Sequence, residues 1–206
     1  LIDISGSMRQ NDPQNLRRPA LRMLVKLLQP GTRAGVWTFG RSVNMLVPHG
    51  QVNQAWKKKA LALSKKIGSP GQFTNIEAVI DRASRSWRSA SDGEARHLVL
   101  LTDGMVDVSK VLVESAESRE RIVTELIPKL QEKGVHVHAI ALSDRADHEL
   151  MQELAVATEG WYEQVNSAQQ LQRIFLKIFE KVGKPDGVPL KGNRFHKKKN
   201  LVNQFK

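Results

Sequence analysis

The 206-residue sequence predicts an α/β fold: a doubly wound, mostly parallel central sheet with one antiparallel edge strand and helices on both faces. Short apolar runs rich in β-branched residues alternate with segments of helical period, as in β-α-β units. The run at 98–101 is continuously apolar rather than alternating, which is typical of a parallel strand buried on both faces. Two further runs, 33–40 and 42–48, are joined by the short turn Gly40-Arg41, which predicts a hairpin and an antiparallel edge strand.

The individual elements are predicted from the hydrophobic periodicity and from the turn and capping residues between the periodic segments. Strands are predicted at 1–3, 33–40, 42–48, 96–104, 135–142 and 161–165. Helices are predicted at 15–28, 52–66, 74–87, 118–134, 147–160 and 167–183. Asn15 is the expected N-cap of the first helix, Thr74 or Asn75 of the third, and Asp147 of the fifth.

Charge and composition restrict the possible functions. Residues 181–206 hold eight Lys or Arg and one acid, whereas residues 1–180 hold 24 basic and 20 acidic residues. The excess of basic over acidic residues is therefore largely a property of the end of the chain. No basic stripe with interleaved aromatic residues is present to predict a nucleic-acid partner. Cysteine is absent, which excludes disulfides and thiolate metal sites and fits either a reducing or an oxidising compartment.

Two acidic loops follow predicted strands. Asp3, Ser5 and Ser7 come directly after the first strand, and Asp103 follows the strand at 96–104. Ligands of open α/β sheets bind beyond the carboxyl ends of the strands, so we expect Asp3 and Asp103 to share one crevice if their strands are neighbours. Thr74, at the start of a helix, is the best candidate for a further oxygen.

These five residues are all oxygen donors. No Cys occurs in the chain, and no His lies near either acidic motif. Oxygen-only ligand sets favour Mg²⁺, Mn²⁺ or Ca²⁺ over zinc. The alternate spacing of Asp3, Ser5 and Ser7 lets one tight loop direct three side chains to a common point, with Gly6 supplying backbone freedom. The sequence therefore predicts a divalent-cation site.

The run from Asp3 to Met8, the Thr74 loop and the Leu101-Thr102-Asp103-Gly104 run together resemble the metal-ion-dependent adhesion site of von Willebrand factor type A domains. The order of elements is similar as well, over roughly residues 1–182. Within that family the chain most resembles bacterial envelope-type members. The resemblance implies an extracytoplasmic location, in the periplasm or anchored in the envelope, with membrane contact only through segments outside this sequence.

The resemblance also implies a mechanism. Ser5, Ser7 and Thr74 would hold the cation, and Asp3 and Asp103 would do so largely through water. One coordination position would stay open for an Asp or Glu of a protein partner. The expected function is therefore a cation-dependent protein-binding module and not an enzyme.

The start of the chain departs from the family pattern. Members have a longer central strand before the motif aspartate, whereas here only Leu1 and Ile2 precede Asp3. We expect that the first strand is truncated and that a chain extended upstream melts at a higher temperature, because half of a central strand leaves ladder groups of its neighbours unpaired. The expected domain is 1–182, and 183–206 is expected to be a basic linker or tail.

Simpler interpretations of the same residues stay open. The Asp3-Ser5-Ser7 loop could merely cap the first helix, and Thr74 could be only an N-cap. Asp107 is best interpreted as a loop acid. His136 and His138 could chelate together, but no third ligand is adjacent, so they are better explained as structural. The four tryptophans are expected to pack in the core or under helices: Trp37, Trp56, Trp87 and Trp161.

Two functional alternatives also remain. A strand-end Asp begins the phosphoaspartyl site of haloacid dehalogenase-like, Mg²⁺-dependent phosphatases, but there an acid stands two residues later, where this chain has Ser5. The replacement removes the general acid or base of that mechanism. The other alternative is a structural module whose metal site is vestigial.

Overall fold

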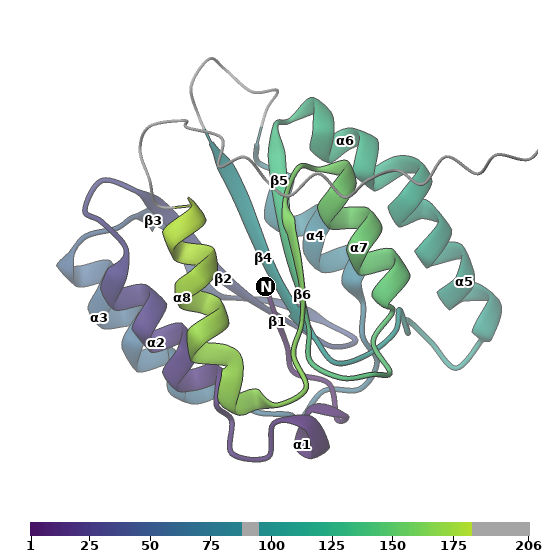
Figure 1. Cartoon of the computed structure of the whole chain (residues 1–206), viewed down its shortest axis with the longest axis horizontal. Helices are drawn as coiled ribbons and strands as arrows, with labels where there is room; N and C mark the ends of the chain where they lie inside the picture. Colours follow the sequence, from purple (N-terminus) through teal and green to yellow (C-terminus); the bar gives the residue numbers. More distant parts are fainter. Residues whose placement is uncertain (88–94, 183–206) are drawn as a thin grey trace, which may run out of the picture.

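The computed structural model describes residues 1–87 and 95–182 and shows a central six-stranded sheet in the order β3-β2-β1-β4-β5-β6 (Figure 1). The predicted α/β fold class is confirmed: β2 and β3 pair antiparallel at one edge, and the remaining neighbours pair parallel. The strands are β1 (Ile2–Asp3), β2 (Arg33–Phe39), β3 (Val43–Gln51), β4 (Arg96–Thr102), β5 (Val135–Ala141) and β6 (Trp161–Gln164).

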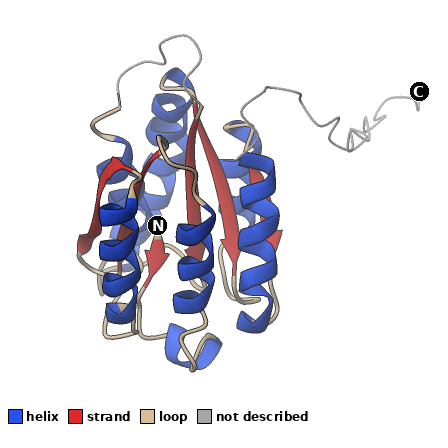
Figure 2. Ribbon diagram, turned by 90° about the vertical axis from the view of Figure 1, so that its left-hand side faces the viewer, coloured by secondary structure: helices blue, strands red, loops and turns tan. Residues whose placement is uncertain are grey.

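Helices cover both faces of this sheet, as Figure 2 shows from the side. One face carries α2 (Arg17–Leu27), α3 (Gln54–Leu63), the short η1 (Ser64–Lys66) and α8 (Leu171–Val182). The other carries α4 (Ile76–Ser84), the continuous α5 (Leu112–Arg121), η2 (Ile122–Leu126) and α6 (Ile127–Glu132), and then α7 (His148–Ala157). Short helices α1 (Met8–Asn11) and η3 (Ala168–Gln170) lie in connections.

The core is divided by the sheet. On the α4 and α7 face it includes Ile80, Leu100 and Leu150, all fully buried. The opposite face packs beneath α2 and α8, where Ile140 and Leu171 are fully buried. Burial on both faces explains the continuous apolar sequence of the central strands. The four tryptophans are partly buried against these clusters, as predicted.

Two local predictions need correction. Asn15 is not an N-cap: it adopts a left-handed backbone with φ 53°, and α2 begins at Arg17. The free N–H groups of that helix start are instead satisfied by Asp12, whose carboxylate accepts from the backbone N of Leu16 and of Arg17. The helix predicted at 118 begins earlier, at Leu112, because exposed apolar residues there hide the helical period. The predicted linker or tail, 183–206, lies outside the described residues.

Gly160 permits the close approach of the α7–β6 connection to β5. A β-carbon at this position would lie 1.8 Å from the carbonyl oxygen of Val137. Gly160→Ala is therefore expected to lower the free energy of unfolding by about 2–3 kcal/mol, since backbone of a central strand must shift. Chemical denaturation checks this, with Gly50→Ala as control, because a β-carbon there has no contact closer than 3.7 Å. Equal effects of the two substitutions would contradict the expectation.

Candidate metal centre

Three loops meet at the carboxyl edge of the sheet. β1 and β4 are direct neighbours, with Ile2 paired to Leu101, so the residues that follow them emerge side by side. The third loop, before α4, is tied to both. Gly71 donates its N–H to the carbonyl of Ile4 at 2.9 Å. Thr74 exchanges two backbone hydrogen bonds with Asp107, of 2.6 and 3.1 Å.

The serines of the first loop connect the two acidic side chains. Ser5 donates its backbone N–H to Asp3 Oδ1 at 2.7 Å. The hydroxyls of Ser5 and Ser7 are 3.0 Å apart, and Ser7 Oγ donates to Asp103 Oδ1 at 2.8 Å. Because Ser7 has one hydroxyl proton and gives it to Asp103, Ser5 is the donor to Ser7. This chain of bonds leaves at least one lone pair free on each hydroxyl oxygen, because Ser7 Oγ uses only one of its two lone pairs to accept from Ser5.

Thr74 reaches the same place from the third loop. Gly104 follows Asp103 in the chain, and Thr74 Oγ1 lies 3.4 Å from the position that a β-carbon on Gly104 would take. The residue is 5% exposed, and its hydroxyl makes no hydrogen bond with any other residue that the structure describes. Capping of α4 falls to Asn75, whose side chain accepts from the backbone N of Ala78. Thr74 therefore brings a free oxygen to the cluster.

Asp3 is a buried carboxyl with no cationic partner among the described residues. It is 0% exposed, and its Oδ2 accepts from Thr102 Oγ1 at 2.5 Å. Burial raises the pKa of Asp3 to about 6, and the nearby charge of Asp103 adds to the rise, while the hydrogen bonds from Thr102 and Ser5 oppose it. The group is thus costly to ionise unless a positive charge is added.

Sequence reasoning missed three residues that hold Asp103 and Asp3. Asn11 of α1 donates to Asp103 Oδ2 at 2.8 Å, and Ser143 donates to the Asp103 carbonyl at 2.8 Å. Thr102 is the partner of Asp3 described above. A signal exists for Asn11, because it stands four residues after Ser7, one turn on if the loop continues as a helix. Ser143 follows β5 at the same edge of the sheet, but a lone serine gives no such signal.

A fully buried ion pair lies beneath the first loop. Arg17 and Asp12 join through Nε and Oδ2 at 2.6 Å, and both side chains are 0% exposed. The same guanidinium donates to the Asp3 carbonyl oxygen at 2.6 Å and to Ser69 Oγ at 2.9 Å. Arg17 therefore fixes the main chain of Asp3 and the loop before α4 at once.

The predicted histidine pair lies away from this edge. His136 and His138 on β5 stack against His97 of β4, at ring-centroid distances of 5.2 and 5.3 Å. His97 Nδ1 and His138 Nε2 are 3.0 Å apart, and His138 Nδ1 is buried without a partner in the described part of the chain. Across residues 1–87 and 95–182, no group of three or more His, Cys, Asp or Glu is arranged to hold a metal.

These histidines predict an acid-sensitive fold. Burial lowers the pKa of His138 to about 3 and that of His97 to about 4, with their mutual proximity, His136 and Lys181 adding to one or both shifts. Below about pH 6.5 the unfolded chain takes up protons that the folded protein excludes, so stability falls as pH falls. We expect a loss of about 1–2 kcal/mol per pH unit between pH 6 and 4.5.

Urea unfolding of wild type and of the double variant His97→Leu/His138→Leu checks this expectation. Subtracting the two curves removes the contribution of Asp3, whose raised pKa acts in the opposite direction over the same range. The double variant should lose distinctly less stability on acidification. Parallel curves for the two proteins would contradict the prediction.

The fold and the cluster at its carboxyl edge define the class. A von Willebrand factor type A domain model matches residues 1–177, and the chain belongs to that family. Such domains are generally adhesion or protein-interaction modules and typically not enzymes. A von Willebrand factor A domain-containing protein of Dictyostelium discoideum is 23% identical over 188 residues, which cover 90% of this chain and 19% of that protein. The chain thus spans about a fifth of that relative.

Solved structures show the same fold at low identity. A von Willebrand factor type A protein from Catenulispora acidiphila gives a TM-score of 0.70 at 16% identity, covering 88% of this chain and 41% of that one. Proximal thread matrix protein 1 from the mussel byssus, with a zinc-occupied MIDAS motif, gives 0.66 at 16% identity, covering 86% and 45%. The vWF domain of the type V pili tip protein Mfa5 of Porphyromonas gingivalis gives 0.61 at 12% identity, covering 91% of this chain and 96% of that domain.

Proposed function

We propose that the chain is a divalent-cation-dependent protein-binding module, in which a cation at the carboxyl edge accepts an acidic side chain from a partner. The observation that carries the proposal is the buried Asp3 carboxyl, beside Asp103, with no Lys, Arg or His side chain bonded to either carboxylate within the described residues. A buried carboxylate pair without positive charge is unfavourable unless a cation is bound.

The donor set fits Mg²⁺ or Mn²⁺, with Ca²⁺ as a further candidate. Ser5, Ser7 and Thr74 would hold the ion through hydroxyl oxygens, while Asp3 and Asp103 would balance its charge largely through water. Bound there, the ion supplies a positive charge with an open position for a carboxylate. The hydrogen bonds already present fit these roles: Ser7 directs its proton to Asp103, and the Thr74 hydroxyl is unused.

The same geometry supports binding over hydrolysis. A phosphoaspartyl mechanism needs a general acid or base beside the nucleophile. The position two residues after Asp3 carries Ser5, whose backbone N–H and hydroxyl are both engaged in the loop. At this position the loop therefore supplies no carboxylic acid for proton transfer to a leaving group, which favours binding of a ligand carboxylate.

We further propose an extracytoplasmic location in a bacterium. The similarity of fold to a pilus tip protein supports the proposal, although the curated relative is from Dictyostelium discoideum. In the described part of the chain no helix is both long and apolar enough to span a membrane.

The open position is tested with Mn²⁺ as the ion and water-proton relaxation as the readout. Bound Mn²⁺ with an exchangeable water should enhance relaxation, and millimolar acetyl-aspartyl amide should reduce the enhancement by displacing that water. Acetyl-asparaginyl amide is the matched control and should have no effect. A bound ion without exchangeable water, or equal effects of the two amides, would refute the proposal.

A further inference from the structure

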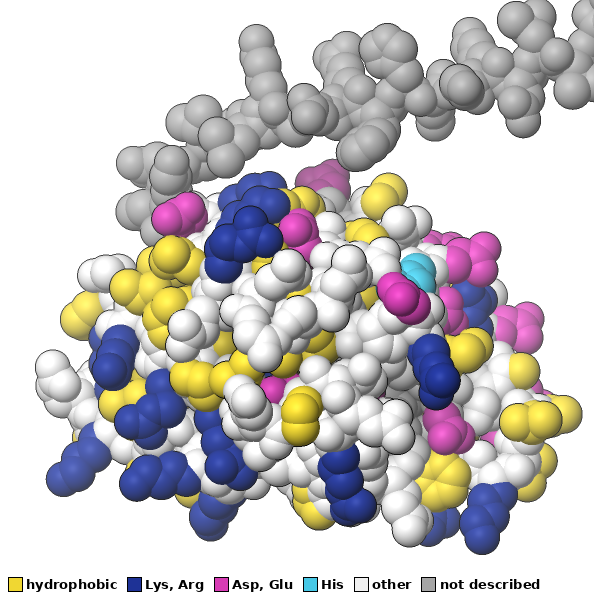
Figure 3. Space-filling model, turned by 60° about the horizontal axis from the view of Figure 1, so that its bottom comes forward, with side chains coloured by type: hydrophobic (Ala, Val, Ile, Leu, Met, Phe, Trp, Pro, Cys, Tyr) yellow, Lys and Arg dark blue, Asp and Glu magenta, His cyan; other side chains and the backbone are white. Residues whose placement is uncertain are grey.

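The charges of this domain are segregated. Between residues 13 and 76 the sequence holds eleven Lys or Arg and no Asp or Glu, whereas residues 95–182 hold ten Lys or Arg and fourteen acids. Figure 3 shows the consequence on one face: dark-blue side chains gather at the lower left, the side on which α2 and α3 lie in Figure 1, with few acids among them. A charge imbalance of this size within one domain creates a directional field.

Helix packing brings these cations together. α2 and α3 lie side by side, and Arg22 Nη1 donates to the Leu61 carbonyl of α3 at 2.9 Å. We define the basic face by six side chains on α2, α3 and η1: Arg22, Lys26, Lys58, Lys59, Lys65 and Lys66. Within the described residues none of the six pairs with a carboxylate.

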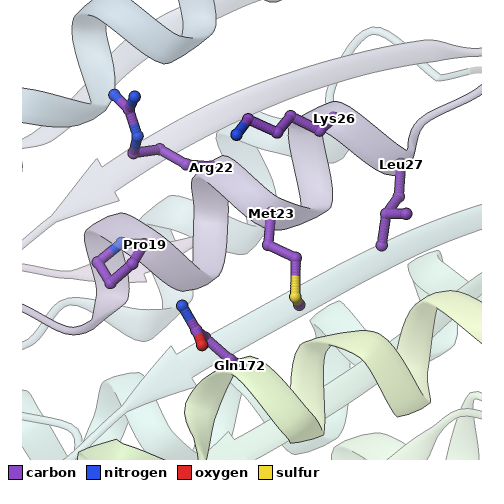
Figure 4. A pocket seen from close by; sticks show the side chains of 6 residues that line it. All are labelled: Pro19, Arg22, Met23, Lys26, Leu27 and Gln172. Carbon is purple, nitrogen blue, oxygen red and sulfur yellow. The ribbon is translucent and has the colours of Figure 1, made fainter.

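The basic face continues into a hollow between α2 and α8 (Figure 4). Its volume is about 360 Å³, and Arg22 and Lys26 border it together with Pro19, Met23 and Leu27. Met23 and Leu27 point toward α8 in this view, whereas the two cations extend from the other side of α2. The hollow thus combines an apolar floor with a cationic rim, without an acidic side chain in its lining.

We propose that the basic face is a docking surface for an acidic segment of a protein partner. Unpaired cations complement its carboxylates, and the apolar floor seats an apolar side chain within it. The inference goes beyond the proposed cation site, because none of the six cations takes part in that site. The two surfaces are nevertheless connected: the loop that leaves Lys66 reaches Ser69, which Arg17 holds, and Gly71, which bonds Ile4.

Other polyanions fit this face less well. The large apolar side chains that are exposed in the described residues all lie outside α2, α3 and η1, so the basic face presents no prominent apolar side chain for insertion into a bilayer. Trp56, the one aromatic residue of α2 and α3, is partly buried and donates its indole N–H to the Pro48 carbonyl, so it offers no free platform for a base.

The test uses poly-L-glutamate as the acidic probe, with the full chain in EDTA at 50 mM and 300 mM NaCl. A variant with Lys58, Lys59, Lys65 and Lys66 all changed to Glu should bind at least about tenfold more weakly at low salt. The control changes Lys110, Lys129, Arg145 and Arg173 to Glu, four exposed cations elsewhere with the same total charge change. The affinity of this control for poly-L-glutamate should fall by less than about threefold, and Asp3→Asn should bind the probe as tightly as wild type does.

Equal losses in the two charge-reversal variants would overturn the proposal, because the effect would then be one of net charge. So would the absence of binding by wild type at 50 mM NaCl. Tighter binding to duplex DNA or to phosphatidylserine vesicles, lost in the same variant, would replace the protein partner with another polyanion. Mn²⁺ binding by the Lys58/Lys59/Lys65/Lys66 variant should match wild type, so a failure here is distinguishable from failure of the cation site.

Discussion

Asp3→Asn is expected to weaken Mn²⁺ or Mg²⁺ binding by at least about 100-fold while making the metal-free protein more stable. The loss of binding follows from removing one of two charges at the centre of the proposed site. The gain in stability follows from the raised pKa of Asp3, about 6 compared with an ordinary value of 3.8. The ionised carboxylate is therefore less favourable in the folded protein than in the unfolded chain.

The contribution of Asp3 to stability changes with pH. A raised folded-state pKa means that Asp3 contributes stability below pH 3.8, which is lost as pH rises through about 6. At pH 7 in EDTA, Asn should therefore be favoured by about 2 kcal/mol, which corresponds to a melting temperature several degrees higher. With saturating Mg²⁺ the difference in melting temperature between Asp3→Asn and wild type should become smaller or change sign, because only wild type gains stability from the ion.

Differential scanning calorimetry and isothermal titration measure both halves of this prediction. Asp107→Asn is the matched control, since Asp107 lies in the same region, has an exposed side chain and contributes backbone groups to the Thr74 bridge. It should leave both quantities unchanged. An Asp3→Asn protein that is less stable than wild type in EDTA would contradict the description of Asp3 as an uncompensated buried charge.

Arg17→Met is expected to lower the free energy of unfolding by about 3–5 kcal/mol. The substitution removes the only cation paired with Asp12 in the described residues and leaves that buried carboxylate unpaired. It also removes the donors that hold the Asp3 carbonyl and Ser69. Binding of Mn²⁺ should therefore weaken as well, although Arg17 is a positioning residue and contacts neither carboxylate of the proposed site.

A second variant separates charge from position. In Arg17→Met/Asp12→Asn the buried charge is gone, and the single amide oxygen can still accept from the backbone N–H of Leu16, one of the two N–H groups that Asp12 now caps. Stability should recover by at least about half, whereas Mn²⁺ affinity should stay low, because the Asp3 carbonyl still lacks its donor. Recovery of both together would show that Arg17 acts on the site only through stability. If Arg17→Met kept both the stability and the Mn²⁺ affinity of wild type, Arg17 would not have the role assigned to it.

Much of the fold and the proposed site could be predicted because both depend on local sequence. The hairpin, the doubly buried strands and the cap at Asp147 are predicted from hydrophobic periodicity and from turn and capping residues, and the structure confirms them. The convergence of Asp3 and Asp103 depends only on β1 and β4 being neighbours, which the parallel topology favours. Their role as metal ligands remains a prediction.

The missed features depend on side-chain packing. Arg17 stands in a run of basic residues and has the same local sequence signal as its exposed neighbours, yet it alone turns inward to Asp12. Asn15 has the composition of an N-cap, but the cap comes from Asp12 because the chain turns through a left-handed residue there. The charge segregation is visible in the sequence, but only the packing of α2 against α3 and α8 turns it into a surface.

Electron paramagnetic resonance of Mn²⁺ titrated into the protein tests the proposed cation site directly, since it counts bound ions and reports oxygen-only coordination. We expect one bound Mn²⁺ per chain, which Mg²⁺ displaces and which is lost in Asp103→Asn, whose fold should remain intact. Absence of binding at millimolar Mn²⁺, or a bound ion that survives both Asp3→Asn and Asp103→Asn, would contradict it.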